Sequence, residues 1–245
     1  MASLAVPKLL AAGHDIALII CCEGREVRNR KWLERRIRKT LRIGLLGAIN
    51  GVRIRSWFSS GPAALLSIES LEDVAARHQV PFFVVPATNS PRTVELMTEA
   101  AADLGISLGN GYIARKVFDI PSFGMINTHH EVLPEYRGAQ SVLWQLYDGS
   151  RTTGFSVHQI DSAIDGGAIL HRETIPIEFR DTLQETVVAT CASLYVRSLD
   201  GLTHVIDHFG ELSRNATPQG DGASFTTPTL WQFFRMVRNH RRLTT

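Results

Sequence analysis

The sequence predicts an α/β protein in which a doubly wound, mostly parallel sheet is flanked by helices. Short runs of β-branched and aromatic residues recur along the chain, and helical patterns lie between them. Strands that alternate with helices in this way are typical of parallel sheets. The composition is that of a globular protein, with 44% hydrophobic and 20% charged residues in a chain of 245. This length allows one large domain or two small ones with a substantial core.

The expected strands are short apolar runs bounded by turn residues. Their β-rich composition and their length favour strands over helices. They cover residues 15–21, 80–86, 104–108, 124–128, 154–160 and 168–177.

The expected helices have recognisable ends. Ser90 followed by Pro91 is the pattern of an N-cap and a first helical residue. Asp181 and Gln184 are spaced as in a capping box, and they open a long apolar-striped helix that Gly210 can close.

The end of the chain differs in composition from the rest. We expect a catalytic domain over 1–211 and a C-terminal extension over 212–245. Residues 219–228 are rich in Gly and Thr, and a basic amphipathic helix follows. The apolar side of this helix carries Leu230, Phe234 and Val237, and around it lie Arg235, Arg238, Arg241 and Arg242.

Positive charge is concentrated between residues 25 and 42, which hold nine Lys or Arg and two Glu. Leu33, Ile37 and Leu41 recur there at helical spacing. We expect a cationic helix that docks on the body by this apolar stripe. Two other interpretations stay open, a surface that faces phosphates of a nucleotide or RNA and a helix in peripheral contact with a membrane. Nucleic acid is not the expected partner.

Several classes of protein are excluded by what the sequence lacks. The longest apolar stretch, 16–22, is too short to cross a bilayer, and the N-terminus has no signal-peptide pattern. Three cysteines without metal-site spacing form neither a disulfide framework nor a zinc site, so buried thiols in a reducing cytosol are expected. The sequence has no GxGxxG and no P-loop, so neither a dinucleotide nor a nucleoside triphosphate site is supported.

The densest group of chemically active side chains lies between residues 123 and 170. Asn127 and His129 are two residues apart in an expected strand and therefore project on the same side. Asp165 precedes two glycines in a loop. An amide and a protonated imidazole can donate hydrogen bonds to a developing oxyanion, and a carboxylate can orient the imidazole and raise its pKa or help move a proton. Since no Ser or Cys has a nucleophile-elbow context, this set favours acyl transfer without a covalent intermediate.

The order of these residues is that of a known family. Residues 127–138 read N-T-H-H-E-V-L-P-E-Y-R-G, and I-D-G-G follows at 164–167. The segment 115–180 resembles the formyltransferases that use N10-formyltetrahydrofolate, which include glycinamide ribonucleotide, methionyl-tRNA and sugar-nucleotide formyltransferases. The resemblance implies that N10-formyltetrahydrofolate is the formyl donor and that no metal takes part.

The resemblance also implies roles for particular residues. The catalytic residues are Asn127, His129 and Asp165. The implied donor-binding residues are Gly109, Asn110, Gly111, Tyr112, Ile113, Leu133 and Asp161. The implied acceptor-binding residues are His130, Glu131, Tyr136, Arg137 and Gly138.

The chain departs from the family pattern in three places. Glu131 replaces a serine and His130 replaces a proline. The pair of histidines is similar to that of formyltetrahydrofolate deformylases, although those carry Phe-Lys where this chain has Tyr136 and Arg137. The chain also opens on a helix, 5–12, where the family has a central first strand. We therefore expect a sheet without this strand. Either another segment fills its place, or the chain is a shortened version of a longer protein.

The acceptor is expected to be a primary amine of a small molecule. About 35 residues follow Gly210, too few for the further β-barrel of methionyl-tRNA formyltransferases. The chain resembles the members that act on amino-sugar nucleotides. The alternatives are a deformylase that releases formate to water and a non-catalytic paralogue that acts as a binding module. A homodimer through apolar residues near the C-terminus is also left open.

Overall fold

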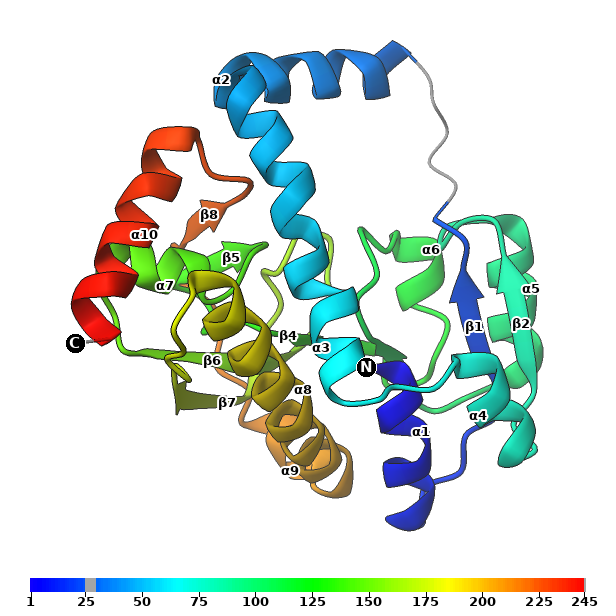
Figure 1. Ribbon diagram of the computed structural model, residues 1–245. Coiled ribbons are helices and arrows are strands. Elements are labelled where there is room, and N and C mark those ends of the chain that lie inside the picture. Colours follow the sequence, from blue (N-terminus) through cyan, green and yellow to red (C-terminus); the bar gives the residue numbers. More distant parts are fainter. Residues whose placement is uncertain (25–29, 245) are drawn as a thin grey trace.

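Strands and helices alternate along most of the chain (Figure 1). The computed structural model describes residues 1–24 and 30–244. The first half contains α1 (Ala2–Ala11), β1 (Ile19–Cys22), α2 (Arg30–Arg55), a short 3-10 helix (Ser56–Phe58), α3 (Ser60–Leu65), α4 (Leu71–Arg77), β2 (Phe82–Val85), α5 (Pro91–Ala100), β3 (Gly105–Ser107) and α6 (Arg115–Phe118). The second half contains β4 (Met125–His129), β5 (Tyr136–Gly138), α7 (Leu143–Asp148), β6 (Thr152–Gln159), β7 (Ile169–Pro176), α8 (Leu183–Asp207), α9 (Phe209–Arg214), β8 (Ala223–Phe225) and α10 (Leu230–Thr244).

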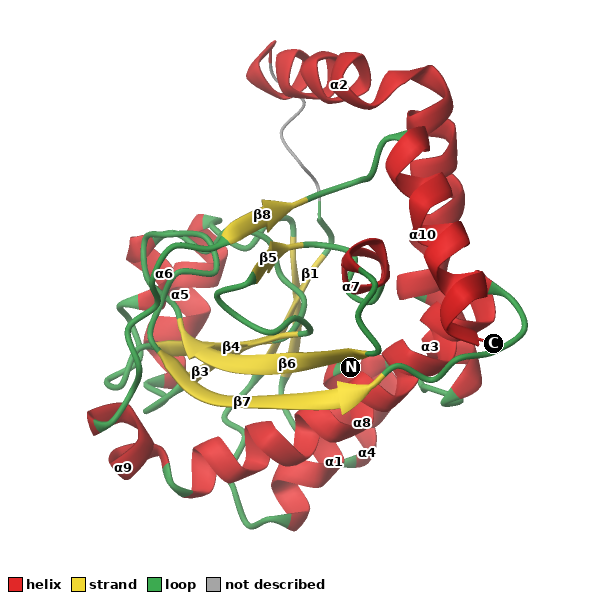
Figure 2. Ribbon diagram, turned by 90° about the vertical axis from the view of Figure 1, so that its left-hand side faces the viewer, coloured by secondary structure: helices red, strands yellow, loops and turns green. Residues whose placement is uncertain are grey.

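The strands form an α/β arrangement with parallel and antiparallel pairs. The largest sheet has the order β3-β4-β6-β7, in which β3 and β4 are parallel and the two following pairs are antiparallel. The pairs β1-β2 and β5-β8 are both parallel, so three of the five strand pairs in the described residues are parallel. All six expected strands are present, whereas β5 and β8 were not expected. Figure 2 shows α8 on one side of the largest sheet and α7 on the other.

Helix α1 packs in two apolar clusters, one beside each of two sheets. Strands β1 and β3 each pair with one strand in the described chain, and β1-β2 forms a sheet separate from β3-β4-β6-β7. Ala5 of α1 is buried in the main core, while Val6 packs in a second cluster with Val74 and Val80. Apolar packing of α1 therefore holds the two sheets together where no strand links them among the described residues.

The main core lies between the largest sheet and α8. Its fully buried members include Ile126 of β4, Phe155 of β6 and Leu194 of α8. Phe233 and Met236 of α10 belong to the same cluster. Helix α10 is thus packed into the core that also supports β4 and β6.

Two of the expected helix ends differ from those observed. Ser90 caps α5 as expected, since its Oγ accepts a hydrogen bond from the Thr93 backbone nitrogen. The capping box of α8 lies one residue further along than expected, at Thr182 and Glu185. Gly210 does not close α8, because that helix ends at Asp207 and Gly210 lies inside α9.

We expect Thr182→Ala to lower the free energy of unfolding by about 1 kcal/mol. The substitution removes the hydroxyl that accepts from the Glu185 backbone nitrogen at 3.2 Å. Asp181→Ala is the matched control and should change stability much less, because Asp181 is not the cap. Denaturant unfolding measures both variants. Equal losses, or a larger loss for Asp181→Ala, would contradict the observed cap.

Helix α2 is bent and is largely exposed. Gly44 has φ 73° and ψ 164°, which breaks the helix into two segments at an angle (Figure 1). The expectation that an apolar stripe docks on the body is wrong for Leu33, Ile37 and Leu41, because each of them is at least half exposed. The first part of the basic segment, 25–29, lies outside the described residues.

Cys191 is buried, and Cys21 and Cys22 are half-buried; all three are free thiols. Within residues 1–24 and 30–244, no helix combines the length and the apolar character needed to cross a bilayer. The same residues contain no group of three or more His, Cys, Asp or Glu side chains placed to hold a metal ion.

Candidate active site

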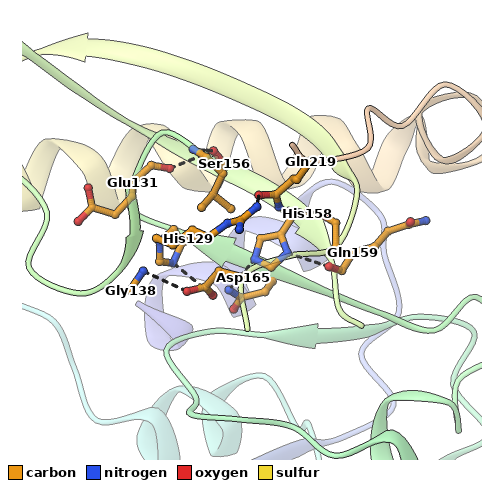
Figure 3. A network of polar contacts seen from close by, with 12 residues as sticks. His129, Glu131, Gly138, Ser156, His158, Gln159, Asp165 and Gln219 are labelled. Atoms are coloured by element: carbon orange, nitrogen blue, oxygen red, sulfur yellow. Dashed lines mark hydrogen bonds and ion pairs between the residues drawn. The ribbon is translucent and has the colours of Figure 1, made fainter. Parts of the chain in front are cut away.

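The three expected catalytic residues lie at one cavity of about 690 Å³. Asn127 and His129 are on β4, and Asp165 is in the loop between β6 and β7. The Asp165 carboxylate points toward the His129 ring (Figure 3). The cavity walls also include residues 109–113, 128, 130–131, 138–141 and 163–164. The end of β4 and two loops therefore bring together the residues that the sequence pattern singles out.

Asp165 is held by the backbone around it. Its Oδ2 accepts a hydrogen bond from the Gly138 nitrogen at 3.2 Å, and its Oδ1 lies 3.8 Å from Nδ1 of His129. Asp165 has φ 50°, a left-handed conformation that Asp tolerates better than most residues. A Cβ at Gly167 would lie 1.9 Å from the Gln159 carbonyl oxygen, so only glycine fits there. This loop directs the carboxylate toward the imidazole.

Asn127 has a partner that the sequence analysis did not find. His158 on β6 is directly opposite Asn127 in the β4-β6 pair, and its Nε2 lies 3.1 Å from Nδ2 of Asn127. The Gln159 carbonyl oxygen, 2.7 Å from Nδ1 of His158, can only accept a hydrogen bond, so Nδ1 carries the proton. Burial lowers the pKa of His158, which keeps this ring neutral with Nε2 as an acceptor. One amide hydrogen of Asn127 is thus engaged, and the other can be donated to a ligand.

His129 is neutral at neutral pH, contrary to the expectation of a protonated ring. Burial lowers its pKa more than the charge of Asp165 and a hydrogen bond to the Tyr136 backbone raise it. Its Nε2 is buried and has no hydrogen-bond partner within the described structure. A neutral imidazole next to a carboxylate can take up a proton during a reaction and be stabilised in the charged form.

The two unusual residues after His129 are both uncharged at neutral pH. Nε2 of His130 lies 3.1 Å from Oγ of Ser198, and burial lowers the His130 pKa to about 3. Oε2 of Glu131 accepts a hydrogen bond from Nε2 of Gln145 at 2.6 Å. Burial raises the Glu131 pKa to about 8, although hydrogen bonds from Gln145 and Ser141 oppose this shift. The glutamate therefore adds a neutral carboxylic acid to the cavity wall where the family pattern has a hydroxyl.

The raised pKa of Glu131 predicts how stability depends on pH. Its folded-state pKa of about 8 exceeds the ordinary value of 4.5, so the folded protein binds the extra proton between these pH values. The contribution of Glu131 to the free energy of unfolding should therefore fall as pH rises from about 5 to about 8 and then level off. Histidines with lowered pKa, such as His129 and His158, contribute with the opposite sign below pH 6.5, so the effect of Glu131 is read as the difference between wild type and a variant. Glu131→Gln, a neutral replacement of the same shape, should remove the Glu131 contribution and leave that of the histidines.

Thermal unfolding of wild type and Glu131→Gln across this pH range measures the difference. Glu135→Gln is the control, since Glu135 is exposed and pairs with Arg172. It should keep the wild-type pH dependence. An identical pH dependence in Glu131→Gln and wild type would contradict a protonated Glu131.

The expected donor-binding loop lies at the cavity. All five residues from Gly109 to Ile113 line it, as does Asp161. Asn89 fixes the end of this loop, because its Nδ2 donates to the Tyr112 carbonyl and its Oδ1 accepts from the Ala114 nitrogen. These two hydrogen bonds thus hold the loop in place as one wall of the cavity.

Three expected site residues are not on the cavity wall. Leu133 is fully buried in the protein, and its backbone nitrogen donates to Oγ of Ser156. Tyr136 donates its hydroxyl to Asp148, and Arg137 donates to the Gly220 carbonyl. Leu133, Tyr136 and Arg137 therefore contact other parts of the protein and do not line the cavity.

The cavity also has walls from parts of the chain that the sequence analysis did not connect with it. Gly51 and Arg55 of α2 and Phe58 line it from one side, and Cys191 and Tyr195 of α8 from another. No local pattern marks these residues, because their position depends on how α2 and α8 pack.

The middle of the chain matches a known protein family. Residues 74–194 match a family model described as formyl transferase. This range contains Asn127, His129 and Asp165. Residues 74–194 therefore belong to the formyl transferase family.

The formyl transferase domain has curated relatives. The chain is 30% identical over 170 residues to a methionyl-tRNA formyltransferase of Thermosynechococcus vestitus. This match covers 67% of this chain and 49% of that protein. The chain is also 30% identical over 129 residues to the bifunctional polymyxin resistance protein ArnA of Wigglesworthia glossinidia brevipalpis. That match covers 52% of this chain and 20% of that protein. The chain thus spans less than half of the length of these relatives.

Solved structures include one of a 4-N formyltransferase from Francisella tularensis. It matches with a TM-score of 0.49 and 16% identity, over 74% of this chain and 82% of that chain.

Proposed function

We propose that the protein is an N-formyltransferase that moves a formyl group from N10-formyltetrahydrofolate to a primary amine. The observation that carries this proposal is the set of Asn127, His129 and Asp165 at one cavity within a formyl transferase domain. An amide donor, a neutral imidazole and a carboxylate are the groups needed to stabilise an oxyanion and move a proton.

The proposed reaction is a direct transfer. The amine nitrogen attacks the formyl carbon, the new C–N bond forms, and negative charge develops on the formyl oxygen. Asn127 donates its free amide hydrogen to that oxygen. His129 takes up the proton that the amine loses and returns it to N10 of the folate as the old C–N bond breaks. Asp165 stabilises the imidazolium that exists between these two steps.

We further propose that the acceptor amine belongs to an amino-sugar nucleotide. The cavity volume lies in the range of small-molecule sites. Arg55, an exposed cation at the cavity wall, has a charge and hydrogen-bond donors that suit a phosphate group. The curated relative from Thermosynechococcus vestitus is named for methionyl-tRNA, so methionyl-tRNA is tested as the competing acceptor.

An acceptor panel tests the substrate class. The protein is incubated with N10-formyltetrahydrofolate and, separately, with dTDP- and GDP-linked 4-amino sugars, glycinamide ribonucleotide and methionyl-tRNA. Mass spectrometry of each acceptor detects the added formyl group. We expect formylation of an amino-sugar nucleotide. Formylation of methionyl-tRNA without any amino-sugar nucleotide product would contradict the proposed acceptor while leaving formyl transfer intact.

Hydrolysis is the second candidate reaction, because a neutral His129 can also activate water. This deformylase would release formate from N10-formyltetrahydrofolate when no amine is present. Formate measured with and without an amine distinguishes the two activities, since a transferase yields formylated acceptor instead. A folded protein that yields neither product would be a non-catalytic binding module.

A further inference from the structure

The loop that carries Asp165 is attached to the segment that follows α9. Ile169, at the start of β7, and Thr217 form an antiparallel bridge with two backbone hydrogen bonds of 2.8 and 2.9 Å. Further along the same segment, Nε2 of Gln219 donates a hydrogen bond to the Gly167 carbonyl oxygen at 2.6 Å. The segment after α9 therefore contacts the loop close to the catalytic carboxylate.

The side-chain amide of Gln219 has a second partner on β5. Its Oε1 accepts a hydrogen bond from Nη2 of Arg137 at 3.2 Å, and the same nitrogen donates to the Gly220 carbonyl oxygen at 2.8 Å. Arg137 directly precedes Gly138, whose backbone nitrogen donates to Asp165. Figure 3 shows Gln219 in the same network of polar contacts as Gly138 and Asp165. One amide thus connects the two parts of the chain that hold the Asp165 carboxylate.

The geometry of this loop depends on being held from outside. Asp165 has φ 50°, and such a conformation costs free energy, so it persists only where the surrounding structure maintains it. The Asp165 carboxylate lies 3.8 Å from Nδ1 of His129, which is longer than a hydrogen bond, so a small shift of the loop would weaken their interaction. Gln219 does not line the cavity, so any effect on the reaction passes through the loop.

We propose that Gln219 is a positioning residue of the active site. Its amide holds the Gly167 carbonyl and thereby keeps the Asp165 carboxylate directed toward His129. This inference rests on the proposed formyl transfer, in which Asp165 stabilises the imidazolium form of His129. Gln219 lies outside residues 74–194, which match the family model, so a segment beyond the matched range sets the geometry of a catalytic residue within it.

Two substitutions at Gln219 test this proposal. Gln219→Ala removes both hydrogen bonds of the amide. Gln219→Glu keeps the length and an acceptor for Arg137, but it puts a carboxylate oxygen where the N–H donor faces the Gly167 carbonyl. Both variants should lower kcat, by up to about 100-fold, with a smaller change in the KM for N10-formyltetrahydrofolate and for a dTDP-linked 4-amino sugar. Gln184→Ala and Gln184→Glu are the matched controls and should keep the wild-type kcat, because Gln184 is exposed near the start of α8.

The pKa of His129 gives a readout that does not depend on turnover. The charge of Asp165 raises this pKa against the effect of burial, and His130 and His158 are the other titratable groups close to the ring. In Gln219→Ala, the His129 pKa measured by NMR titration should be lower than in wild type, because the carboxylate is no longer held beside the ring. A merely structural role would lower thermal stability and leave the pKa in the folded protein unchanged.

Three results would overturn the proposal. The first is an unchanged His129 pKa in folded Gln219→Ala. The second is wild-type kcat in either Gln219 variant; in Gln219→Glu it would show that the contact with Arg137 is sufficient. The third is a loss of activity that follows only the loss of folded protein in thermal unfolding. If wild type formylated no amine, the proposed function would fail, and the His129 titration would still decide whether Gln219 positions the Asp165 loop.

Discussion

Asp165→Asn is expected to lower kcat about 10²–10⁴-fold while the affinity for N10-formyltetrahydrofolate changes little. Asp165 lies 3.8 Å from Nδ1 of His129, and its charge opposes the effect of burial on the His129 pKa. Without that charge, the buried imidazole cannot hold the proton that leaves the amine. Asparagine keeps the size and the acceptor oxygen for the Gly138 nitrogen, so the loop should stay in place.

The control for this variant is Asp148→Asn. It makes the same change of charge at a residue of α7 that accepts a hydrogen bond from Tyr136, outside the cavity. Steady-state kinetics and folate-binding titrations of both variants separate chemistry from binding. If Asp165→Asn turned over at a rate near that of wild type, Asp165 would have no part in the mechanism.

Asn127→Ala is expected to lower kcat about 10²–10³-fold, the usual effect of removing one donor from an oxyanion site. His158 fixes the amide of Asn127 by a 3.1 Å contact, so the wild-type donor is oriented before substrate binds. Because the negative charge develops only in the transition state, the KM for both substrates should change much less than kcat.

Asn215→Ala serves as the control, since Asn215 is exposed at the end of α9. It should behave as wild type in kcat and stability. An Asn127→Ala variant that loses affinity for the folate in proportion to its activity would show that the amide binds the ground state rather than the transition state.

Much of the catalytic set could be predicted because it is local in the sequence. Asn127 and His129 lie on one short strand, and a period of two places them on one side. Asp165 precedes glycines that the loop requires, and Gly167 has no room for a side chain. His158 could not be found in this way, because its contact with Asn127 depends on the register of an antiparallel strand pair.

The parts of the fold that were missed depend on long-range packing. β5 and β8 are three residues each, too short to show a strand pattern, and they pair across a large separation in the chain. Asp181 and Thr182 are both suitable N-caps by residue type, and only the backbone conformation decides between them. The periodicity of α2 predicted an amphipathic helix but not which surroundings its apolar side would face.

The most direct test of the proposed formyl transfer follows the absorbance change of N10-formyltetrahydrofolate with and without an amine acceptor. Wild type and Asp165→Asn are compared at equal concentration of folded protein. We predict that tetrahydrofolate forms with wild type only when an acceptor amine is present and that Asp165→Asn is nearly inactive. Product formation at the same rate without an acceptor, or no product with any acceptor, would contradict the proposed function.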